Sequence, residues 1–370
     1  MNWDTVVVGA GFAGIVVAER LAGRGNQVLV VEKRPHIGGN SYDCYDSHGI
    51  LIHLYGPHIF HTKSKMVWDY LSSFTHWRHY SHKVLAQIDG IKVTVPFNLN
   101  SLDLVFSREF ASVLANKLIL SFGYGARVPI LKMLQNGDKD IKFLADYVYE
   151  KVFLNYNIKQ WGIRPEEIDA SVTERVPVLV DRDDRYFQDP YQGMPGQGYT
   201  RMFERMLDNA NITVMLSTDY KSILGDIKFK RMIYTGPVDY FFDYKHGRLP
   251  YRSIRFEFET MDVKFFQDAA VVNYPNDYNF TRITEYKHLT GQKHKKTTVG
   301  REFPEDYRPD ENVPCYPIHK PANMVILERY KKEADKLDNV VFLGRLAEYK
   351  YYNMDEVVEK ALALAENLPR

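Results

Sequence analysis

A glycine-rich turn near the start of the chain has the residue types and spacing of a phosphate-binding motif. Gly9-Ala-Gly-Phe-Ala-Gly14 separates two apolar runs, so it is expected to join a strand to a helix. In such a turn the first glycine permits the bend, the second lets a pyrophosphate approach the backbone, and the third packs the helix on the strand. Glu32 ends the next apolar run, where a carboxylate can accept hydrogen bonds from an adenosine ribose. The spacing therefore predicts a dinucleotide-binding site.

The residues after Glu32 favour FAD over NAD. Lys33-Arg-Pro-His-Ile-Gly-Gly-Asn40 contains two more glycines, which let a second stretch of backbone lie beside a long cofactor. No second GxGxxG motif follows, so NAD(P)H is expected only as a transient reductant. Asn353 and Glu356 have capping-box spacing at the start of the last predicted helix, whose free amides would face either the flavin or water.

The elements around these residues predict an α/β protein with several domains. Its 370 residues suffice for two or three domains, and its 45% hydrophobic and 26% charged residues are typical of globular proteins. Asp89-Gly90 separates two short apolar runs and predicts an antiparallel hairpin. Apolar spacings between about 100 and 160 predict helices, and alternation within 253–286 predicts further antiparallel strands.

We therefore expect a Rossmann-like FAD-binding domain with a helical insert and an antiparallel β-sheet domain, and a substrate cleft where they meet. The expected boundaries are 1–78, 199–240 and 330–370 for a discontinuous FAD-binding domain, 99–165 for the helical insert, and 79–98, 166–198 and 241–329 for the sheet domain.

Charge and cysteine content exclude several kinds of partner. The 48 Lys and Arg against 47 Asp and Glu leave a net charge of +1, without the single-sign field that nucleic-acid binding requires. Cys44 and Cys315 are too few for a disulfide framework and suit a reducing cytoplasm. The uncharged run Thr5–Ala18 is too short to cross a bilayer and lacks the pattern of a signal peptide. A cytoplasmic protein with no nucleic-acid or membrane partner is expected.

A group of histidines could suggest a metal site. His53, His58 and His61 lie close together in the sequence, but no carboxylate or cysteine has matching ligand spacing. No metal is expected.

Motifs along essentially the whole chain resemble those of bacterial UDP-galactopyranose mutase. These motifs are GAGFAG (9–14), EKRPHIGGN (32–40), YGPHIFHT (55–62), KQWG (159–162), ERVPV (174–178), DRYFQDPYQGMP (184–195), YTGPVDYFFDY (234–244), FTRITEYKH (280–288) and GRLAEYKYYNMD (344–355). The resemblance implies a homodimeric flavoprotein isomerase, an intramolecular transferase of galactofuranose biosynthesis for cell-surface polysaccharide. It would interconvert UDP-galactopyranose and UDP-galactofuranose without net redox change, with N5 of reduced FAD as the nucleophile at the anomeric carbon.

The resemblance also implies roles for individual residues. The catalytic group would be Arg175 and Arg282, which grip the diphosphate, and His61 near the isoalloxazine, with Arg175 on a mobile lid. Substrate contacts would further come from the diphosphate donors Tyr186, Tyr316 and Tyr351, the uracil platform Tyr156, the positioning residue Trp161, and Asn273 and His82. Cofactor contacts would come from Gly9, Gly11, Phe12, Ala13, Gly14, Glu32, Lys33, Arg34, Gly39, Asn40, His58, Ile59, Asp219, Gly344, Arg345, Met354, Asp355, Glu356 and Val357.

Two departures from the family pattern leave the preferred sugar open. Asn353 stands where the family often has aspartate, and His82 where it often has asparagine. A mutase for a 2-acetamido or deoxy hexose nucleotide is therefore an alternative. An amine-oxidase-like flavin oxidoreductase and a non-catalytic binding protein related to GDP-dissociation inhibitors are further alternatives on the same fold.

Overall fold

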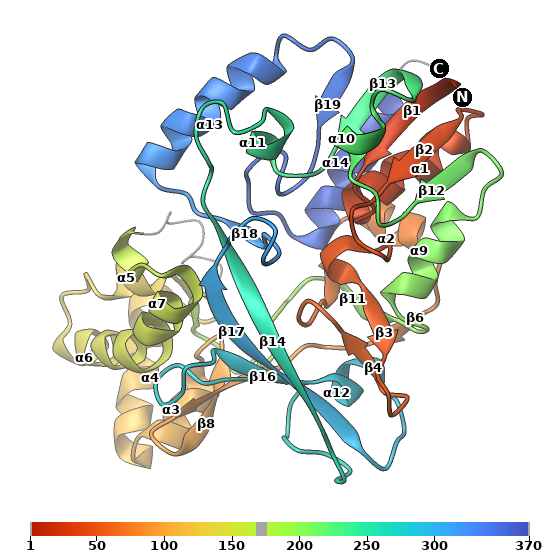
Figure 1. Cartoon of the computed structure of the whole chain (residues 1–370). Coiled ribbons are helices and arrows are strands. Elements are labelled where there is room, and N and C mark those ends of the chain that lie inside the picture. Colours follow the sequence, from red (N-terminus) through yellow and green to blue (C-terminus); the bar gives the residue numbers. More distant parts are fainter. Residues whose placement is uncertain (1, 168–175, 369–370) are drawn as a thin grey trace. The chain divides into compact units, whose positions relative to one another are not determined.

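The structure is a computed structural model that describes residues 2–167 and 176–368 of the chain. Contacts divide it into two compact units (Figure 1). The first comprises Met1–Tyr80, Asp189–Ser253 and Asp306–Arg370, and the second comprises Ser81–Gln188 and Ile254–Glu305. The division into three domains expected from the sequence stays a prediction. No described helix is both long and apolar enough to cross a membrane.

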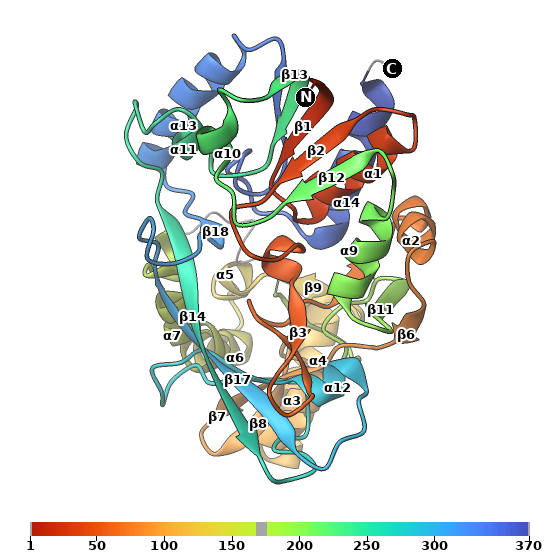
Figure 2. The ribbon, with the colours of Figure 1, turned by 45° about the vertical axis from the view of Figure 1, so that its right-hand side comes forward.

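The first unit contains a five-stranded parallel sheet of order β12-β2-β1-β13-β19. The last four residues of β1 are buried, as expected for a strand with both faces covered. Helix α1 packs against α14 and α9, and Figure 2 shows α1 and α14 side by side. The sheet confirms the predicted Rossmann-like fold. Its elements are β1 (Asn2–Val8), β2 (Val28–Val31), β12 (Ile212–Met215), β13 (Lys228–Tyr234), β19 (Val340–Phe342), α1 (Phe12–Ala22), α9 (Tyr199–Leu207) and α14 (Met354–Asn367).

The rest of the first unit consists of shorter elements and helix α13. Strands β5, β11 and β6 form a small antiparallel sheet, and β3 pairs with β4. The 14-residue helix α13 has no counterpart among the sequence expectations. The shorter elements are η1 (Gly39–Ser41), β3 (Asp43–Tyr45), β4 (Leu51–His53), β5 (Phe60–Thr62), α2 (Lys65–Ser72), β6 (Trp77–His79), β11 (Tyr191–Pro195), α10 (Tyr220–Ile223), α11 (Val238–Phe241), β18 (Tyr316–Pro317) and α13 (Pro321–Ala334).

The second unit is built on a mainly antiparallel sheet. The strands follow the order β18-β14-β17-β16-β15-β7-β8, in which β18 pairs with the start of β14. The β7–β8 hairpin turns at Asp89 and Gly90, whose φ angles of 46° and 83° confirm the predicted turn. Strands β15 and β7 are an exception and pair in parallel. Parallel neighbours need a long connection, and these two strands are far apart in the sequence. The strands are β7 (Val84–Ile88), β8 (Ile91–Val95), β14 (Tyr251–Met261), β15 (Val271–Asn273), β16 (Arg282–Glu285) and β17 (Thr297–Asp306).

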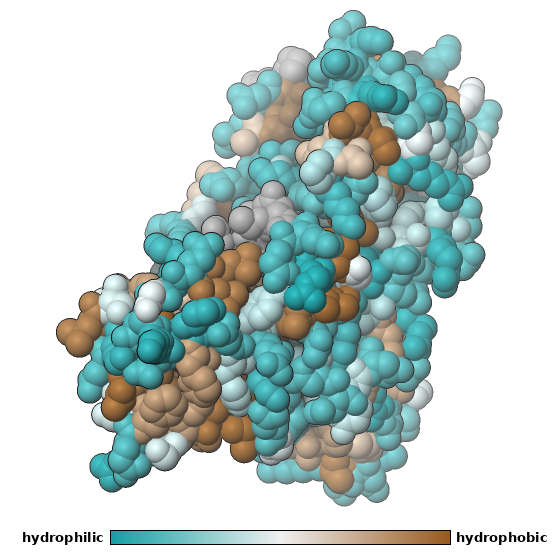
Figure 3. Space-filling model, turned by 90° about the vertical axis from the view of Figure 1, so that its left-hand side faces the viewer, coloured by the Kyte–Doolittle hydropathy of each residue, from teal (hydrophilic) through white to brown (hydrophobic). Residues whose placement is uncertain are grey.

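The predicted helices between 100 and 160 also belong to the second unit. Helices α3, α4 and α6 each begin after a capping residue whose side chain accepts a backbone N–H of the first turn. These capping residues are Asn98, Ser107 and Asp138. Several large apolar side chains of this region are exposed, among them Leu104 and Leu120. Figure 3, which views the side of the molecule on which these helices lie, shows brown apolar patches on its surface. The elements are α3 (Leu99–Val105), α4 (Arg108–Phe122), β9 (Arg127–Val128), α5 (Ile130–Met133), α6 (Lys139–Val148), the π-helix η2 (Tyr149–Leu154), α7 (Asn155–Trp161), η3 (Pro165–Glu167), β10 (Val178–Leu179) and α12 (Tyr286–Thr290).

Candidate active site

A cavity of about 590 Å³ lies in the first unit at the carboxyl ends of β1 and β2. Ligands of open α/β sheets bind at this edge. The cavity brings together most of the cofactor residues expected from the sequence, whereas Gly14, Ile59, Asp355 and Glu356 do not line it. Those that line it are Gly9, Gly11, Phe12, Ala13, Glu32, Lys33, Arg34, Gly39, Asn40, His58, Asp219, Gly344, Arg345, Met354 and Val357.

The turn that borders the cavity can be built only with glycine at two positions. Gly9 has a φ of 102°, and a Cβ there would lie 2.1 Å from Thr235 Oγ1. A Cβ on Gly14 would lie 2.0 Å from the carbonyl oxygen of Gly9. Gly14 therefore acts behind the cavity wall, where it lets α1 pack against the turn.

Polar groups of the cavity wall fit an anionic dinucleotide. Glu32 accepts the Ala10 N–H at 2.8 Å and the Arg34 N–H at 2.9 Å, which holds its carboxylate at the end of β2. Each carboxylate oxygen keeps a second lone pair for a ribose hydroxyl. Nη2 of Arg34 donates to Asn40 at 2.8 Å, while its buried Nη1 has no partner among the described residues. Arg34 itself lines the cavity, which places its cationic side chain at the wall.

Helix α14 points its first turn at the same cavity. Asn353 and Glu356 form the predicted capping box, in which the Asn353 N–H donates to Glu356 at 2.6 Å. Met354 and Val357 line the cavity, while the Glu356 carboxylate serves the cap. Burial raises the pKa of the Asp355 carboxyl, and a hydrogen bond with the Thr62 side chain opposes this shift.

The histidines predicted near the flavin have different surroundings. Burial lowers the pKa of His58 to about 3 and that of His53 to about 4, so both are neutral at physiological pH. His61 Nδ1 lies 2.6 Å from a carboxylate oxygen of Asp189. Asp189 was not among the residues expected at the site, although it lies within the DRYFQDPYQGMP motif. Among the described residues no His, Cys, Asp and Glu side chains gather as a metal site requires.

Two of the expected diphosphate ligands stack beside the cavity. The rings of Tyr316 and Tyr351 lie 5.5 Å apart at an interplanar angle of 14°. The Arg345 guanidinium lies 5.4 Å from the first ring centroid and 4.8 Å from the second, which are cation–π distances. Arg345 also donates to the Tyr352 carbonyl at 2.6 Å. Because Arg345 lines the cavity, it links these two tyrosines to the cofactor residues.

In the second unit, the sheet brings two further candidates together. Asn273 on β15 is the register partner of Arg282 on β16, and Arg282 is that of Glu302 on β17. Arg282 Nε lies 2.9 Å from Glu302 Oε2. Glu302 is only 2% exposed, and burial raises its pKa although the guanidinium opposes this shift. Sequence reasoning missed Glu302, because its pairing with Arg282 depends on strand register.

The remaining candidates lie elsewhere in the second unit. The ring centroids of His82 and Tyr186 are 5.7 Å apart, and the Tyr186 N–H donates to the His82 carbonyl at 2.7 Å. Tyr156 and Trp161 both lie on α7. Arg175 lies outside the described residues.

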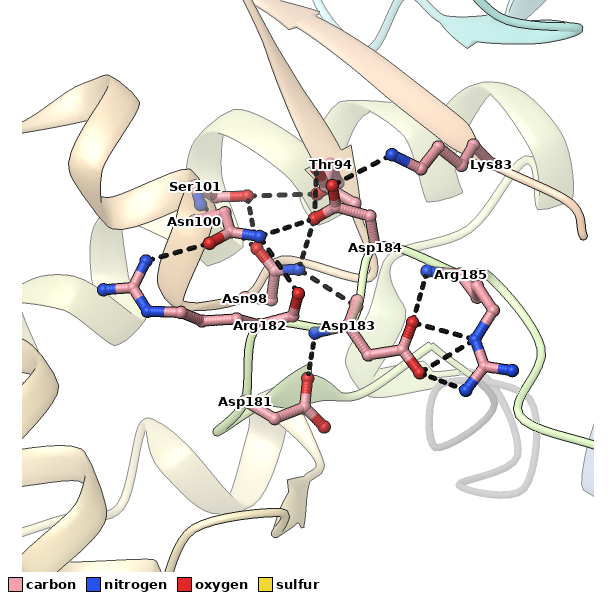
Figure 4. A network of polar contacts seen from close by, with 10 residues as sticks. All are labelled: Lys83, Thr94, Asn98, Asn100, Ser101, Asp181, Arg182, Asp183, Asp184 and Arg185. Carbon is pink, nitrogen blue, oxygen red and sulfur yellow. Dashed lines mark hydrogen bonds and ion pairs between the residues drawn. The ribbon is translucent and has the colours of Figure 1, made fainter.

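The segment before Tyr186 is held by a network around Asp184 (Figure 4). One carboxylate oxygen of Asp184 accepts amide N–H groups of Asn98 at 3.0 Å and Asn100 at 2.9 Å, and the other lies 3.0 Å from Lys83 Nζ. Burial would raise the pKa of Asp184, but these donors lower it to about 2. The carboxylate therefore anchors the start of the DRYFQDPYQGMP motif.

The parallel sheet, the glycine turn and the cavity define a Rossmann-like dinucleotide-binding protein. A profile of NAD(P)-binding Rossmann-like domains matches residues 7–74, and the profile of the UDP-galactopyranose mutase family matches residues 151–351. A probable UDP-galactopyranose mutase of Klebsiella pneumoniae is 36% identical over 99% of this chain and 94% of its own length. A UDP-galactopyranose mutase of Mycoplasma pneumoniae is 35% identical over 100% of this chain and 97% of its own. The chain therefore belongs to the UDP-galactopyranose mutase family, which is a family of isomerases.

One further relative and two solved structures are also similar to this chain. A dTDP-fucopyranose mutase of Escherichia coli is 32% identical over 98% of this chain and 97% of its own length. A solved structure of reduced UDP-galactopyranose mutase has a TM-score of 0.75 and 14% identity, covering 99% of this chain and 93% of that one. A putrescine oxidase variant has a TM-score of 0.60 and 13% identity, covering 99% of each chain. These structural likenesses bear on the fold alone.

Proposed function

We propose that this protein interconverts UDP-galactopyranose and UDP-galactofuranose with FAD in the cavity of the first unit. Family membership over nearly the full chain supports the reaction class. The observation that carries the proposal is the Tyr316–Arg345–Tyr351 group, which joins diphosphate-type donors to a wall of the cofactor cavity. Family membership also supports a cytoplasmic homodimer that serves cell-surface polysaccharide synthesis.

The cavity wall supports FAD as the dinucleotide. Glu32 offers lone pairs to the adenosine ribose, the glycine turn and Arg34 offer N–H donors to the pyrophosphate, and the first turn of α14 offers amides to the flavin end. Reduced FAD would supply the nucleophile at the anomeric carbon through N5, so no protein nucleophile is needed. NAD(P)H would act as a transient reductant.

The residues of this chain would bind and orient the sugar nucleotide. Arg282 would hold the diphosphate while it leaves and returns, with Glu302 keeping its guanidinium in place. Tyr316 and Tyr351 would donate hydroxyl hydrogen bonds to the same group, and Tyr186, Asn273 and His82 would make further contacts. Neutral His58 fits a site in which a flavin must act as a nucleophile, because an imidazolium would withdraw electron density from it.

Which sugar nucleotide the protein uses is the main question for an experiment, because one relative is named for a different sugar. The resemblance implies that Asn353 and His82 depart from the family pattern, and a dTDP-fucopyranose mutase is among the relatives. The test is an anaerobic assay with dithionite-reduced holoenzyme and three substrates: UDP-galactofuranose, its 2-acetamido analogue and dTDP-fucofuranose. The proposal expects UDP-galactofuranose to have the highest kcat/KM. A higher value for either other substrate would replace the proposed substrate, and no turnover of any of them would refute mutase activity.

A further inference from the structure

Two segments of the second unit carry candidate substrate residues and contact each other directly. Helix α7 carries Tyr156 and Trp161. The loop between β15 and β16, residues 274–281, lies between Asn273 and Arg282 in the sequence. Any device that fixes α7 to this loop therefore sets the distance between the two pairs of substrate residues.

Three side chains form such a device. Asn276 in the loop donates from Nδ2 to the carbonyl of Lys151 at 3.0 Å. Asn155 at the start of α7 donates to Asn276 Oδ1, also at 3.0 Å. Lys159 Nζ lies 2.9 Å from the carbonyl oxygen of Tyr274 and 3.5 Å from that of Phe280, at the two ends of the loop. We call Asn155, Lys159 and Asn276 the clamp.

The π-helix η2 provides one acceptor of the clamp. This helix has i→i+5 hydrogen bonds, is uncommon, and often occurs at functional sites. The Lys151 carbonyl that accepts the Asn276 amide belongs to η2. Asn157 of α7 donates to the carbonyl of Phe153, also in η2, at 2.8 Å. Side-chain amides thus occupy two carbonyls where the helix changes from π to α geometry.

Contacts within the loop hold its residues together, so the position of the loop determines the positions of the residues at its two ends. The Tyr274 N–H donates to the Thr281 carbonyl at 2.8 Å and closes the loop. Tyr278 stacks on Phe280 with centroids 4.8 Å apart, and Tyr274 meets Phe280 edge to face at 5.1 Å. A shift of the loop would therefore move Asn273 and Arg282 with it.

Lys159 belongs to the KQWG motif but has no role in the reaction derived above. Its side chain is half-buried, and desolvation lowers its pKa. A lysine ammonium normally stays in water, because burial is costly unless acceptors replace its hydration. The two loop carbonyls supply those acceptors.

We propose that the clamp is a positioning device that holds Tyr156 and Trp161 at a fixed distance from Asn273 and Arg282 for sugar-nucleotide binding. The inference rests on the proposed function, because it takes these four residues as substrate contacts. None of the clamp side chains needs to touch the substrate. Their effect would appear in substrate affinity more than in the chemical step.

The test compares Lys159→Met and Asn276→Ala with a matched control, Lys151→Met. The control removes a lysine from the same helical stretch, which pairs with Asp89, but keeps the backbone carbonyl that the clamp uses. We expect Lys159→Met and Asn276→Ala each to raise the KM for UDP-galactofuranose about tenfold. The first removes a charged donor to two carbonyls, and the second removes an amide that both donates and accepts a hydrogen bond. The kcat should fall less than about threefold and flavin content should stay unchanged, because the cofactor cavity is in the first unit.

Two further measurements separate positioning from general destabilisation. Lys159→Arg, which keeps a cationic donor, should recover most of the lost affinity. The double variant should cost less than the sum of the two single variants, because both act through one device. Amide hydrogen exchange should rise at residues 149–161 and 274–281 in Lys159→Met but not in Lys151→Met.

The outcomes distinguish the clamp from the proposed function. Active wild-type enzyme with a KM in Lys159→Met and Asn276→Ala equal to that of Lys151→Met would overturn the clamp alone. Faster exchange without a change in KM would also overturn it, since the attachment would then have no bearing on substrate. Wild-type enzyme that neither turns over UDP-galactofuranose nor binds UDP by calorimetry would overturn the proposed function and the clamp with it.

Discussion

At the scale of residues, half-buried Arg282 and buried Glu302 would separate substrate binding from cofactor binding in the proposed reaction. Glu302 is buried, so its carboxylate keeps a fixed position 2.9 Å from the Arg282 guanidinium. Both residues belong to the second unit, whereas the cavity assigned to FAD lies in the first. Losing the cation should therefore affect the diphosphate and leave the flavin bound.

Arg282→Ala should lower turnover by about 100-fold or more, the effect of removing one group that stabilises developing charge. Arg301→Ala is a suitable control, because Arg301 lies on β17 and pairs with Glu259 near the surface. Steady-state kinetics and the flavin absorbance per protein would measure both effects. Loss of flavin in Arg282→Ala would contradict this division of roles.

Glu32→Ala should weaken FAD binding by about 10–100-fold, because it removes a ribose acceptor and leaves the Ala10 N–H without its carboxylate partner. Flavin release on dilution measures the change. Glu204→Ala on α9, where Glu204 forms a surface ion pair with Arg201, should bind flavin as the wild type does. Equal flavin affinity in both variants would argue against Glu32 as a cofactor ligand.

Residues differ in how far the sequence predicts them. Glu32 was found because the dinucleotide motif fixes its place after the turn. Asp189 and Glu302 were not, because His61 meets Asp189 across 128 positions of sequence and Glu302 meets Arg282 only through strand register. Pairings of this kind become visible only once the sheets are assembled.

At the scale of elements, the junction of β1 and α1 requires a residue without a side chain, Gly14. A Cβ on Gly14 would also lie 2.9 Å from Val7 Cγ1, so both strand and turn would have to move. The same residue shapes the cavity without lining it.

Gly14→Ala should therefore destabilise the protein by about 1–3 kcal/mol through overpacking, and lower its flavin content. Gly225→Ala is the matched control, because a Cβ there would meet nothing within 4 Å. Thermal melts of both proteins measure the difference. A Gly14→Ala protein as stable as the Gly225→Ala protein would show that the turn tolerates a side chain.

The Asp184 network should give a pH-dependent contribution to stability. The pKa of the Asp184 carboxyl falls from an ordinary value of 3.8 to about 2 in the folded chain. The contribution is therefore complete above about pH 4 and is lost as the pH falls toward 2. Asp184→Asn should cost about 1–3 kcal/mol of unfolding free energy at neutral pH, and this difference should shrink between pH 4 and 2. Denaturant melts at several pH values measure it, and a constant difference would contradict the network.

Other elements show what sequence patterns leave out. The Rossmann core and the β7–β8 hairpin follow from glycine spacing and apolar runs. Helix α13 buries only Leu327 and Tyr330, so its apolar periodicity is weak, and β17 contains Gly300 and Pro304, which are unusual within strands. Gly300 is accommodated because Tyr286 occupies the space a side chain would need. The π-helix η2 has no sequence signal of its own.

At the scale of the whole molecule, the two units have different tasks in the proposed reaction. The first contains the cofactor cavity, Tyr316 and Tyr351, and the second contains Tyr156, Trp161 and Arg282. Oxidases such as the putrescine oxidase variant share the fold, so the fold alone does not separate isomerisation from oxidation. The separation depends on whether the flavin changes its redox state during turnover.

The most direct test of the account follows flavin absorbance and product together, under anaerobic conditions, after UDP-galactofuranose is mixed with stoichiometrically reduced enzyme. The account predicts many UDP-galactopyranose molecules per flavin while the flavin stays reduced, and no product from the oxidised enzyme. Product formation by oxidised enzyme, or flavin oxidation in step with product, would contradict it.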